Sequence, residues 1–238
     1  MLNIAHRGAS GYAPENTRAA FERAIAMGAD AIETDVRQTF DGGLVLMHDA
    51  TVTRTTSGHG PVADHTLAEL RALDAGSWFA LEFAGERVVT LHELIEELVP
   101  RIEVVLEIKD ATAAAPTVEA ITAAGIADRV QVTSFLWAPL LEAKQLAPEL
   151  TLGFLTPEFD RDIIRRCAGR GFAQVCPRVD TLTPELVREA HDAGLFVRAW
   201  GVSRQEQVAT LFDAGADGAT VNWPDWIARH QRVSDMEN

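Results

Sequence analysis

Short apolar runs alternate along this chain with longer segments whose apolar residues recur at helical spacing. Leaving aside "LVLMHD" at 44–49, there are eight such runs, and each is followed by a helix or by a segment that contains one. The runs are "LNIAH", "DAIETDV", "EVVLEIK", "VQVTSF", "TLGFL", "AQVCP", "FVRAW" and "DGATV". Eight strands with intervening helices favour a closed parallel barrel over an open sheet. The pattern therefore predicts an α/β fold, the (β/α)8 or TIM barrel.

Two features interrupt this regular repeat. "LVLMHD" comes after "FDGG", a tight-turn signal, and we interpret it as an antiparallel extension of the second strand. Residues 50–88 are rich in Thr, Gly, His and Asp, and we interpret them as a small insertion after the second strand, over one end of the barrel. A length of 238 residues suits one closed barrel, and no linker divides the chain. We therefore expect a single domain, residues 1–238.

The charge balance restricts the possible partners. A formal net charge of -14 argues against a nucleic acid or an anionic membrane as partner, because both require clustered Lys and Arg. An anionic substrate would therefore need a cation within its own site. Two cysteines, Cys167 and Cys176, are too few for a disulfide framework, and we interpret them as reduced core thiols. With no targeting segment and no membrane-spanning run, we expect a cytoplasmic enzyme, and its oligomeric state stays open.

Acidic side chains gather at the ends of neighbouring strands. "IETD" places Glu33 and Asp35 two residues apart, so both point to the same face, which in a barrel strand is the interior. "LEIK" places Glu107 and Lys109 in the same relation on the next strand. Three converging acids are best explained by a hard divalent cation, which prefers carboxylate oxygen. The alternative is a structural ion network in which Lys109 pairs with the acids of "IETD".

Two histidines join this cluster. His6 ends the first strand, and His48 ends the antiparallel extension. Reaction sites of parallel barrels are assembled at the carboxyl ends of the strands, so this placement favours a catalytic pair. In the loop "RGASGYAPENT", a plainer interpretation is that Asn16 or Thr17 caps the following helix and that Arg7 and Glu15 form a solvated pair.

Nine short motifs in register resemble those of the glycerophosphodiester phosphodiesterases. The motifs are "HRG", "PENT", "ETD", "DGGLVLMHD", "RTT", "LHEL", "LEIK", "TSF" and a late "AW". Each motif alone is weak, but together they run from residue 4 to about 226. The family fold is a (β/α)8 barrel with a small insertion after the second histidine, which agrees with the strand count.

The resemblance implies a metal-dependent hydrolysis of glycerophosphodiesters to sn-glycerol 3-phosphate and an alcohol. It implies one divalent metal ion, Mg²⁺ or Ca²⁺, bound by Glu33, Asp35 and Glu107. It also implies that His6 and His48 are the acid/base pair. In the family the glycerol 2-hydroxyl is the expected first nucleophile. No residue pattern says which histidine is the acid.

Further roles follow from the same resemblance. Arg7 and Lys109 are expected to contact the phosphate, and Trp200 to line the glycerol side of the site. Glu15 and Asn16, in the family's "PEN" motif, are expected to support the loop near Arg7 and the metal.

The chain departs from the family pattern near its end. "GATVNWPD" has Val221, Asn222 and Trp223 where many relatives have Thr-Asp before the proline. None of the expected acids, bases or ligands is among them, so we expect the reaction to be kept and the shape of the substrate site to differ.

Two other functions are compatible with a barrel of this kind. One is a metal-dependent enzyme of another class, with Lys109 as the base that abstracts a proton next to a carboxylate. The other is a non-catalytic metabolite-binding module on the same fold. The first predicts one key base and the second predicts loss of His6 or His48, whereas both histidines are present.

Overall fold

Eight parallel strands close into a barrel in the computed structural model, which describes the backbone of residues 1–237 and the side chains of residues 1–232. The strands are β1 (Leu2–His6), β2 (Ala31–Gln38), β4 (Glu103–Ile108), β5 (Val130–Ser134), β6 (Thr151–Thr156), β7 (Gln174–Pro177), β8 (Phe196–Val202) and β9 (Gly218–Val221). They pair in chain order, and β1 pairs in parallel with both β9 and β2 to close the ring. The predicted (β/α)8 barrel is confirmed.

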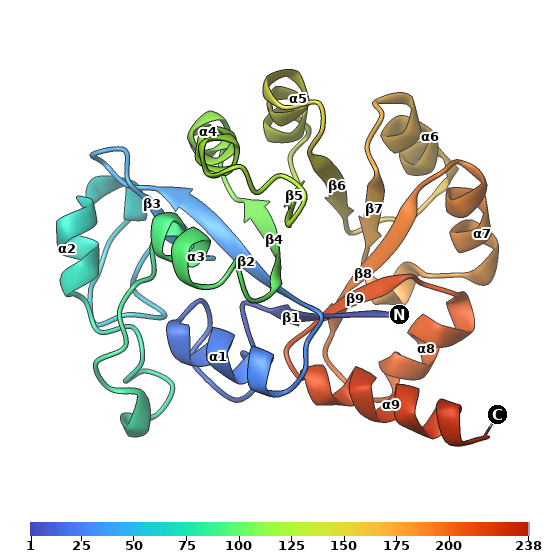
Figure 1. Cartoon of the computed structure of the whole chain (residues 1–238), viewed down its shortest axis with the longest axis horizontal. Helices are drawn as coiled ribbons and strands as arrows, with labels where there is room; N and C mark the ends of the chain where they lie inside the picture. The colour runs from blue at the N-terminus through green and yellow to red at the C-terminus, as the bar shows by residue number, and fades with distance from the viewer. Residues whose placement is uncertain (238) are drawn as a thin grey trace.

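Helices surround the barrel, as Figure 1 shows. They are α1 (Arg18–Ala26), α3 (Leu91–Glu97), α4 (Ala114–Ala124), α5 (Trp137–Leu146), α6 (Arg161–Gly169), α7 (Pro184–Asp192), α8 (Gln207–Ala214) and α9 (Pro224–Glu237). Thr17, Thr90 and Thr183 cap the first turns of α1, α3 and α7 through their side-chain oxygens. The cap of α1 is thus Thr17 rather than Asn16. No helix in the described part of the chain is both long enough and apolar enough to cross a membrane.

The barrel interior changes from apolar to polar along each strand. Ile4, Ala31 and Val105, on β1, β2 and β4, pack together as a buried apolar cluster inside the barrel. Two residues further along the same three strands stand His6, Glu33 and Glu107, which share the inward face because strand side chains alternate. The apolar layer therefore supports a polar layer at the carboxyl ends of the strands.

The expected antiparallel extension is β3 (Leu44–Leu46), which pairs with the outer edge of β2. Residues 47–90 follow it and contain α2 (Leu67–Ala72) and two short 3-10 helices, η1 (Val62–Asp64) and η2 (Leu81–Phe83). This segment lies to one side of the barrel, beyond β3 on the left of Figure 1. Together with Val45 of β3 it forms a small core separate from that of the barrel, which contains Met47, Val52, Val62, Leu70, Ala75 and Val88. Its boundaries as an insertion in a single domain stay a prediction.

The short 3-10 helices η3 (Ala111–Ala113) and η4 (Val179–Thr181) complete the connections. The two cysteines are buried and unpaired, as expected. Burial raises the pKa of the Cys167 thiol to about 12, so at neutral pH this thiol is protonated and inert.

We expect Leu70→Ala to lower the free energy of unfolding by about 2–4 kcal/mol, because Leu70 is fully buried in the core of the inserted segment. Urea denaturation of the purified variant measures this. Leu81→Ala is the matched control, since Leu81 in the same segment is 85% exposed and its loss should change stability by less than about 0.5 kcal/mol. Equal stability of the two variants would show that this small core does not support the fold.

Candidate active site

A cavity of about 300 Å³ opens where the strands end. One side is polar and is lined by His6, Arg7, Glu33, His48 and Glu107. The other side is mostly apolar and is lined by Phe135, Leu155, Trp200 and Val202, with Arg198, Thr220 and Asn222 between the two sides. Residues that lie far apart in the sequence thus meet at one cavity, because they stand on or just after neighbouring strands of the barrel.

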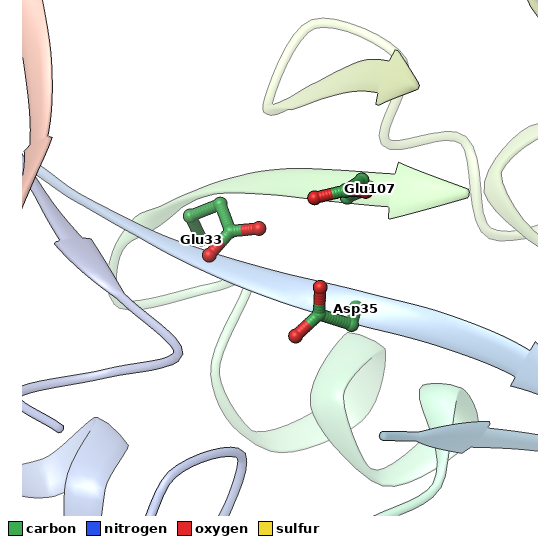
Figure 2. A group of neighbouring side chains, drawn as sticks. All are labelled: Glu33, Asp35 and Glu107. Atoms are coloured by element: carbon green, nitrogen blue, oxygen red, sulfur yellow. The ribbon is translucent and has the colours of Figure 1, made fainter. Parts of the chain in front are cut away.

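Three carboxylates converge beside this cavity. Glu33 and Asp35 extend from β2 and Glu107 from β4, and their side chains point toward one another in Figure 2. Asp35 is the register partner of Glu107 in the β2–β4 ladder. One oxygen of each carboxylate lies within 4.8 Å of the others, and all three residues are buried. The alternation that predicted their common face is confirmed.

The cluster is electrostatically unbalanced. Burial, together with the charges of Asp35 and Glu107, raises the pKa of Glu33 to about 8. Burial likewise raises the pKa of Glu107. Although burial also opposes ionisation of Asp35, the charges of Arg7 and Lys109 hold the pKa of that carboxyl below its usual value. Arg7 and Lys109 therefore stabilise the charged form of Asp35. The charged forms of Glu33 and Glu107 remain disfavoured, and an added cation would stabilise them.

The chemistry of these donors fits a hard divalent cation. Oδ1 of Asp35 is buried and has no hydrogen-bond partner among the described residues, although it lies 3.3 Å from Nζ of Lys109. An unpaired buried carboxylate oxygen is costly unless a cation coordinates it. Glu33, Asp35 and Glu107 together offer an all-oxygen set of the kind that Mg²⁺ and Ca²⁺ bind.

A cage of side chains holds the acids in place. Nε of Arg7 lies 3.3 Å from Oδ2 of Asp35, and its Nη1 donates to Glu15 at 2.8 Å. Nδ2 of Asn16 donates to the same Asp35 oxygen at 2.9 Å. Nζ of Lys109 donates to Glu107 at 2.7 Å. Arg7 and Glu15 are 14% and 12% exposed, so they form a mostly buried pair rather than a solvated one.

This cage requires unusual backbone geometry. Arg7 and Asn16 both adopt a positive φ of 56°, which is uncommon for residues with a side chain. Between them, Gly8 has φ 78°, and a Cβ there would stand 2.6 Å from the backbone carbon of Ala20. The loop after β1 is therefore wound tightly against α1, and this winding directs Arg7 and Asn16 toward Asp35.

Each histidine has a different partner. Nδ1 of His6 donates to the side-chain oxygen of Asn222 at 2.6 Å, and Nδ1 of His48 donates to Asp49 at 2.7 Å. Burial is the largest cause that lowers the pKa of His6, to about 4. Burial also lowers the pKa of His48, while the carboxylates of Asp35 and Asp49 raise it. The lowered pKa values favour the neutral form of both rings at pH 7. The hydrogen bonds at Nδ1 leave Nε2 of each ring for proton transfer, and Nε2 of His6 lies 3.9 Å from Oε2 of Glu33.

Arg54 connects the acid next to His48 with the acid next to Arg7. It donates twice to Asp49, through Nε at 2.7 Å and Nη2 at 3.0 Å. It also donates twice to Glu15, through Nη1 at 2.8 Å and Nη2 at 2.7 Å. The partner of His48 and the partner of Arg7 are therefore held by one guanidinium, in the fork geometry that makes such pairs specific.

Trp200 forms the apolar wall with a fixed orientation. Its Nε1 donates to the carbonyl of Cys176 at 3.0 Å and to that of Thr156 at 3.2 Å. Phe135 packs edge-on against it, with ring centroids 5.1 Å apart. The wall is thus rigid and offers a flat apolar face to a ligand.

The structure places every predicted site residue in or beside this cavity, and it adds residues that the sequence did not single out. Asp49 stands next to His48 in the chain, so adjacency was an available signal. Asn222 lies within the departure at Val221–Trp223 and contacts His6 across the closure of the barrel. Phe135 is the last residue of the "TSF" motif, although no role was assigned to it, and Arg198 carried no signal beyond its place in a strand.

A parallel barrel with buried acids and two partnered histidines at the carboxyl ends of its strands is the architecture of an enzyme. The model of the glycerophosphoryl diester phosphodiesterase family matches residues 6–226. The chain therefore belongs to this family, and it is a phosphodiesterase.

Individual relatives agree over nearly the whole length. A glycerophosphodiester phosphodiesterase from Caldanaerobacter subterraneus subsp. tengcongensis is 39% identical, covering 95% of this chain and 96% of the relative. A phosphodiesterase from Oleispira antarctica, solved with the product sn-glycerol-3-phosphate, is 31% identical with a TM-score of 0.91, covering 96% of both chains. A glycerophosphodiester phosphodiesterase from Agrobacterium tumefaciens is 30% identical with a TM-score of 0.85, covering 95% of this chain and 98% of that one.

We expect Asp49→Asn to lower the pKa of His48, because the carboxylate stabilises the imidazolium form and a neutral amide does not. Titration of the imidazole ring signals by NMR measures this, with His48→Gln to assign the signal. Asp64→Asn is the control, since Asp64 is an exposed acid of the inserted segment that does not line the cavity. A pKa of His48 that does not move, or that rises, would mean that Asp49 does not stabilise the charged ring.

Proposed function

We propose that this enzyme hydrolyses glycerophosphodiesters to sn-glycerol 3-phosphate and an alcohol, with a divalent cation at the acidic cluster and two histidines as proton-transfer groups. The observation that carries the proposal is that three buried carboxylates and two partnered histidines meet at one cavity. The product seen in the Oleispira relative supports this substrate class.

Glu33, Asp35 and Glu107 are the residues that would hold the metal, Mg²⁺ or Ca²⁺. When bound, such an ion supplies positive charge that offsets the charge of the phosphodiester. Asn16 and Glu15 support the site indirectly, because Asn16 holds an oxygen of Asp35 and Glu15 holds the guanidinium of Arg7.

Arg7 and Lys109 are the proposed contacts for the phosphate. Arg7 lines the cavity, and its guanidinium also pairs with Asp35 and Glu15, which fixes its position. Lys109 pairs with Asp35 and Glu107 at the same site. Trp200 is the proposed apolar contact for the glycerol carbons, since its rigid ring lines the opposite wall.

His6 and His48 move the protons in this proposal. One histidine, with Nε2 unprotonated, takes the proton of the attacking hydroxyl. The other must carry a proton on Nε2, as an imidazolium, to give it to the departing alkoxide, which is otherwise a poor leaving group. The hydrogen bond of each Nδ1, to Asn222 or to Asp49, fixes the tautomer and leaves Nε2 for the exchange.

The attacking group comes from the substrate or from water. Ser134 ends β5, next to the cavity-lining Phe135, and its Oγ donates to the carbonyl of Ile108 at 2.7 Å. It is buried and does not line the cavity. The glycerol 2-hydroxyl, already tethered to the phosphorus, is the proposed first nucleophile.

The rival in which Lys109 acts as a base is disfavoured. Although burial opposes its charge, the carboxylates of Asp35 and Glu107 raise the pKa of Lys109 above its usual value, so it is protonated at neutral pH. A protonated amine donates and does not abstract a proton. A non-catalytic binding module has no need for the two partnered histidines.

Hydrolysis of a panel of glycerophosphodiesters is expected to stop in excess chelator and to return on adding Mg²⁺ or Ca²⁺. Glu33→Gln, Asp35→Asn and Glu107→Gln are each expected to weaken metal binding, because each removes one charged ligand. Calorimetric metal titration checks this directly. Glu96→Gln, an exposed acid, is the control. Full turnover in chelator would remove the metal from the mechanism, and no turnover of any diester would refute the substrate class.

His6→Ala and His48→Ala are each expected to lower turnover by about 10²-fold or more while the fold is kept, the usual scale for a lost general acid or base. In the double variant the losses should not simply multiply if both groups act in one step. Steady-state rates and circular dichroism measure the two effects. His92→Ala, an exposed histidine on α3, is the control. A near-normal rate in either site variant would assign that histidine a structural role.

A further inference from the structure

Arg198 occupies the floor of the active-site cavity. It stands on β8 two residues before Trp200, so both side chains point to the inside of the barrel. The residue is 1% exposed, and it lines the same cavity as the histidines and the acids. No motif in the sequence singled it out.

The guanidinium of Arg198 is only partly satisfied. Its Nη1 donates to Oγ1 of Thr220 on the neighbouring strand β9. The thiol of Cys176 lies within hydrogen-bonding reach of the guanidinium, whose charge and hydrogen bond oppose the rise that burial causes in the pKa of that thiol. Nε and Nη2 of Arg198, however, have no oxygen acceptor among the described residues. Arg198 also forms no ion pair with any carboxylate in the described part of the chain, although Glu33 lies near enough to be influenced by its charge.

The other two cations of the site are already engaged. Arg7 pairs with Glu15 and Asp35, and Lys109 pairs with Asp35 and Glu107, at distances of 2.7 to 3.3 Å. An arginine stays charged at any physiological pH, so Arg198 contributes a positive charge that no carboxylate of the described residues meets in an ion pair. Burying such a charge with two unused donors is costly unless a ligand uses them.

We propose that Arg198 is a third cationic residue for the substrate, holding an anionic phosphate oxygen of the glycerophosphodiester or of its product from the floor of the cavity. This proposal rests on the proposed function for the identity of the ligand. Thr220 anchors one end of the guanidinium, so the two unused donors are the part that a ligand oxygen can engage. Trp200, next on the same strand face, would then place the glycerol carbons beside the phosphate.

A purely structural role for Arg198 predicts a different effect of its removal on the stability of the ligand-free protein. If Arg198 served the fold, its removal would leave the barrel interior less stable. In our proposal the unpaired charge is a cost in the ligand-free protein, and replacing it by an apolar residue of similar length is neutral or stabilising. Stability without ligand and affinity for an anion therefore separate the two roles.

The test compares Arg198→Met and Arg198→Lys with the unchanged enzyme in one metal-containing buffer. Calorimetry measures binding of inorganic phosphate, sn-glycerol 3-phosphate and glycerol. We expect Arg198→Met to bind both anions about 10- to 100-fold more weakly, the range for a hydrogen bond to a charged group, and glycerol equally well. Arg198→Lys, which keeps the charge without the fork, should lose less affinity. Melting of the ligand-free Met variant should occur at or above the temperature of the unchanged enzyme.

Arg178→Met is the matched control. Arg178 follows β7, is about half exposed, lies 3.6 Å from Asp180 and does not line the cavity, so its removal changes the net charge and one exposed ion pair but no residue of the cavity. Unchanged phosphate affinity in Arg198→Met would overturn the proposal, and so would an equal loss of affinity for glycerol and for the anions. If the Met variant does not fold, the Lys variant decides, since phosphate affinity equal to that of the unchanged enzyme contradicts the proposal.

Failure of the proposed function gives a different result. In that case the unchanged enzyme hydrolyses no glycerophosphodiester, whereas inorganic phosphate still binds and still depends on Arg198. If the unchanged enzyme hydrolyses glycerophosphodiesters but phosphate affinity does not change when Arg198 is replaced, only the proposed role of Arg198 is refuted.

Discussion

Three carboxylates buried side by side inside a barrel are the constraint around which the site is organised. Like charges in a medium of low polarity repel, and water is not there to weaken the repulsion. Arg7 and Lys109, each 3.3 Å from an oxygen of Asp35, and the side-chain amide of Asn16, which donates to the same carboxylate, reduce this repulsion. These partners still leave the pKa of Glu33 at about 8, which is why the cluster fits a divalent cation.

The barrel supplies this arrangement through register. Because Asp35 lies opposite Glu107 and His6 lies opposite Glu33, residues from three strands occupy one layer. The layer beneath is apolar and close-packed, so the acids cannot relax away from one another. The pleat that places Ile4 and Ala31 in the core also places His6 and Glu33 in the cavity.

Local rules were enough to predict most of the fold and the convergence of the three acids. Alternation in "IETD" determines that Glu33 and Asp35 share a face, and the repeated strand and helix pattern determines that this face is the barrel interior. The contacts of Arg54, Asn222 and Arg198 could not be predicted in the same way. Arg54 reaches Glu15 across 39 residues, and Asn222 reaches His6 across 216, so each contact depends on how the ring closes and on which rotamers pack. Arg198 stands in "FVRAW", where a charged residue in an apolar strand has no distinguishing local pattern.

The departure at Val221–Trp223 also has a structural role. Asn222 holds Nδ1 of His6, which a side chain without an acceptor could not do. Trp223 stacks on Trp226 at 4.3 Å and covers Gly11 so closely that a Cβ there would stand 2.2 Å from the indole nitrogen. The C-terminal end of the barrel therefore shapes the loop after β1, since Trp223 leaves room only for a glycine at position 11.

The guanidinium of Arg54 belongs to the inserted segment, residues 50–88, whereas its partners Asp49 and Glu15 lie outside it, just before the segment and in the first barrel loop. Proteins open locally at free energies below that of global unfolding, and a segment with its own small core is such a unit. Opening of residues 50–88 would withdraw Arg54 and release Asp49 and Glu15 together, while the eight strands stayed paired. Heat or denaturant is therefore expected to inactivate this enzyme before its barrel melts.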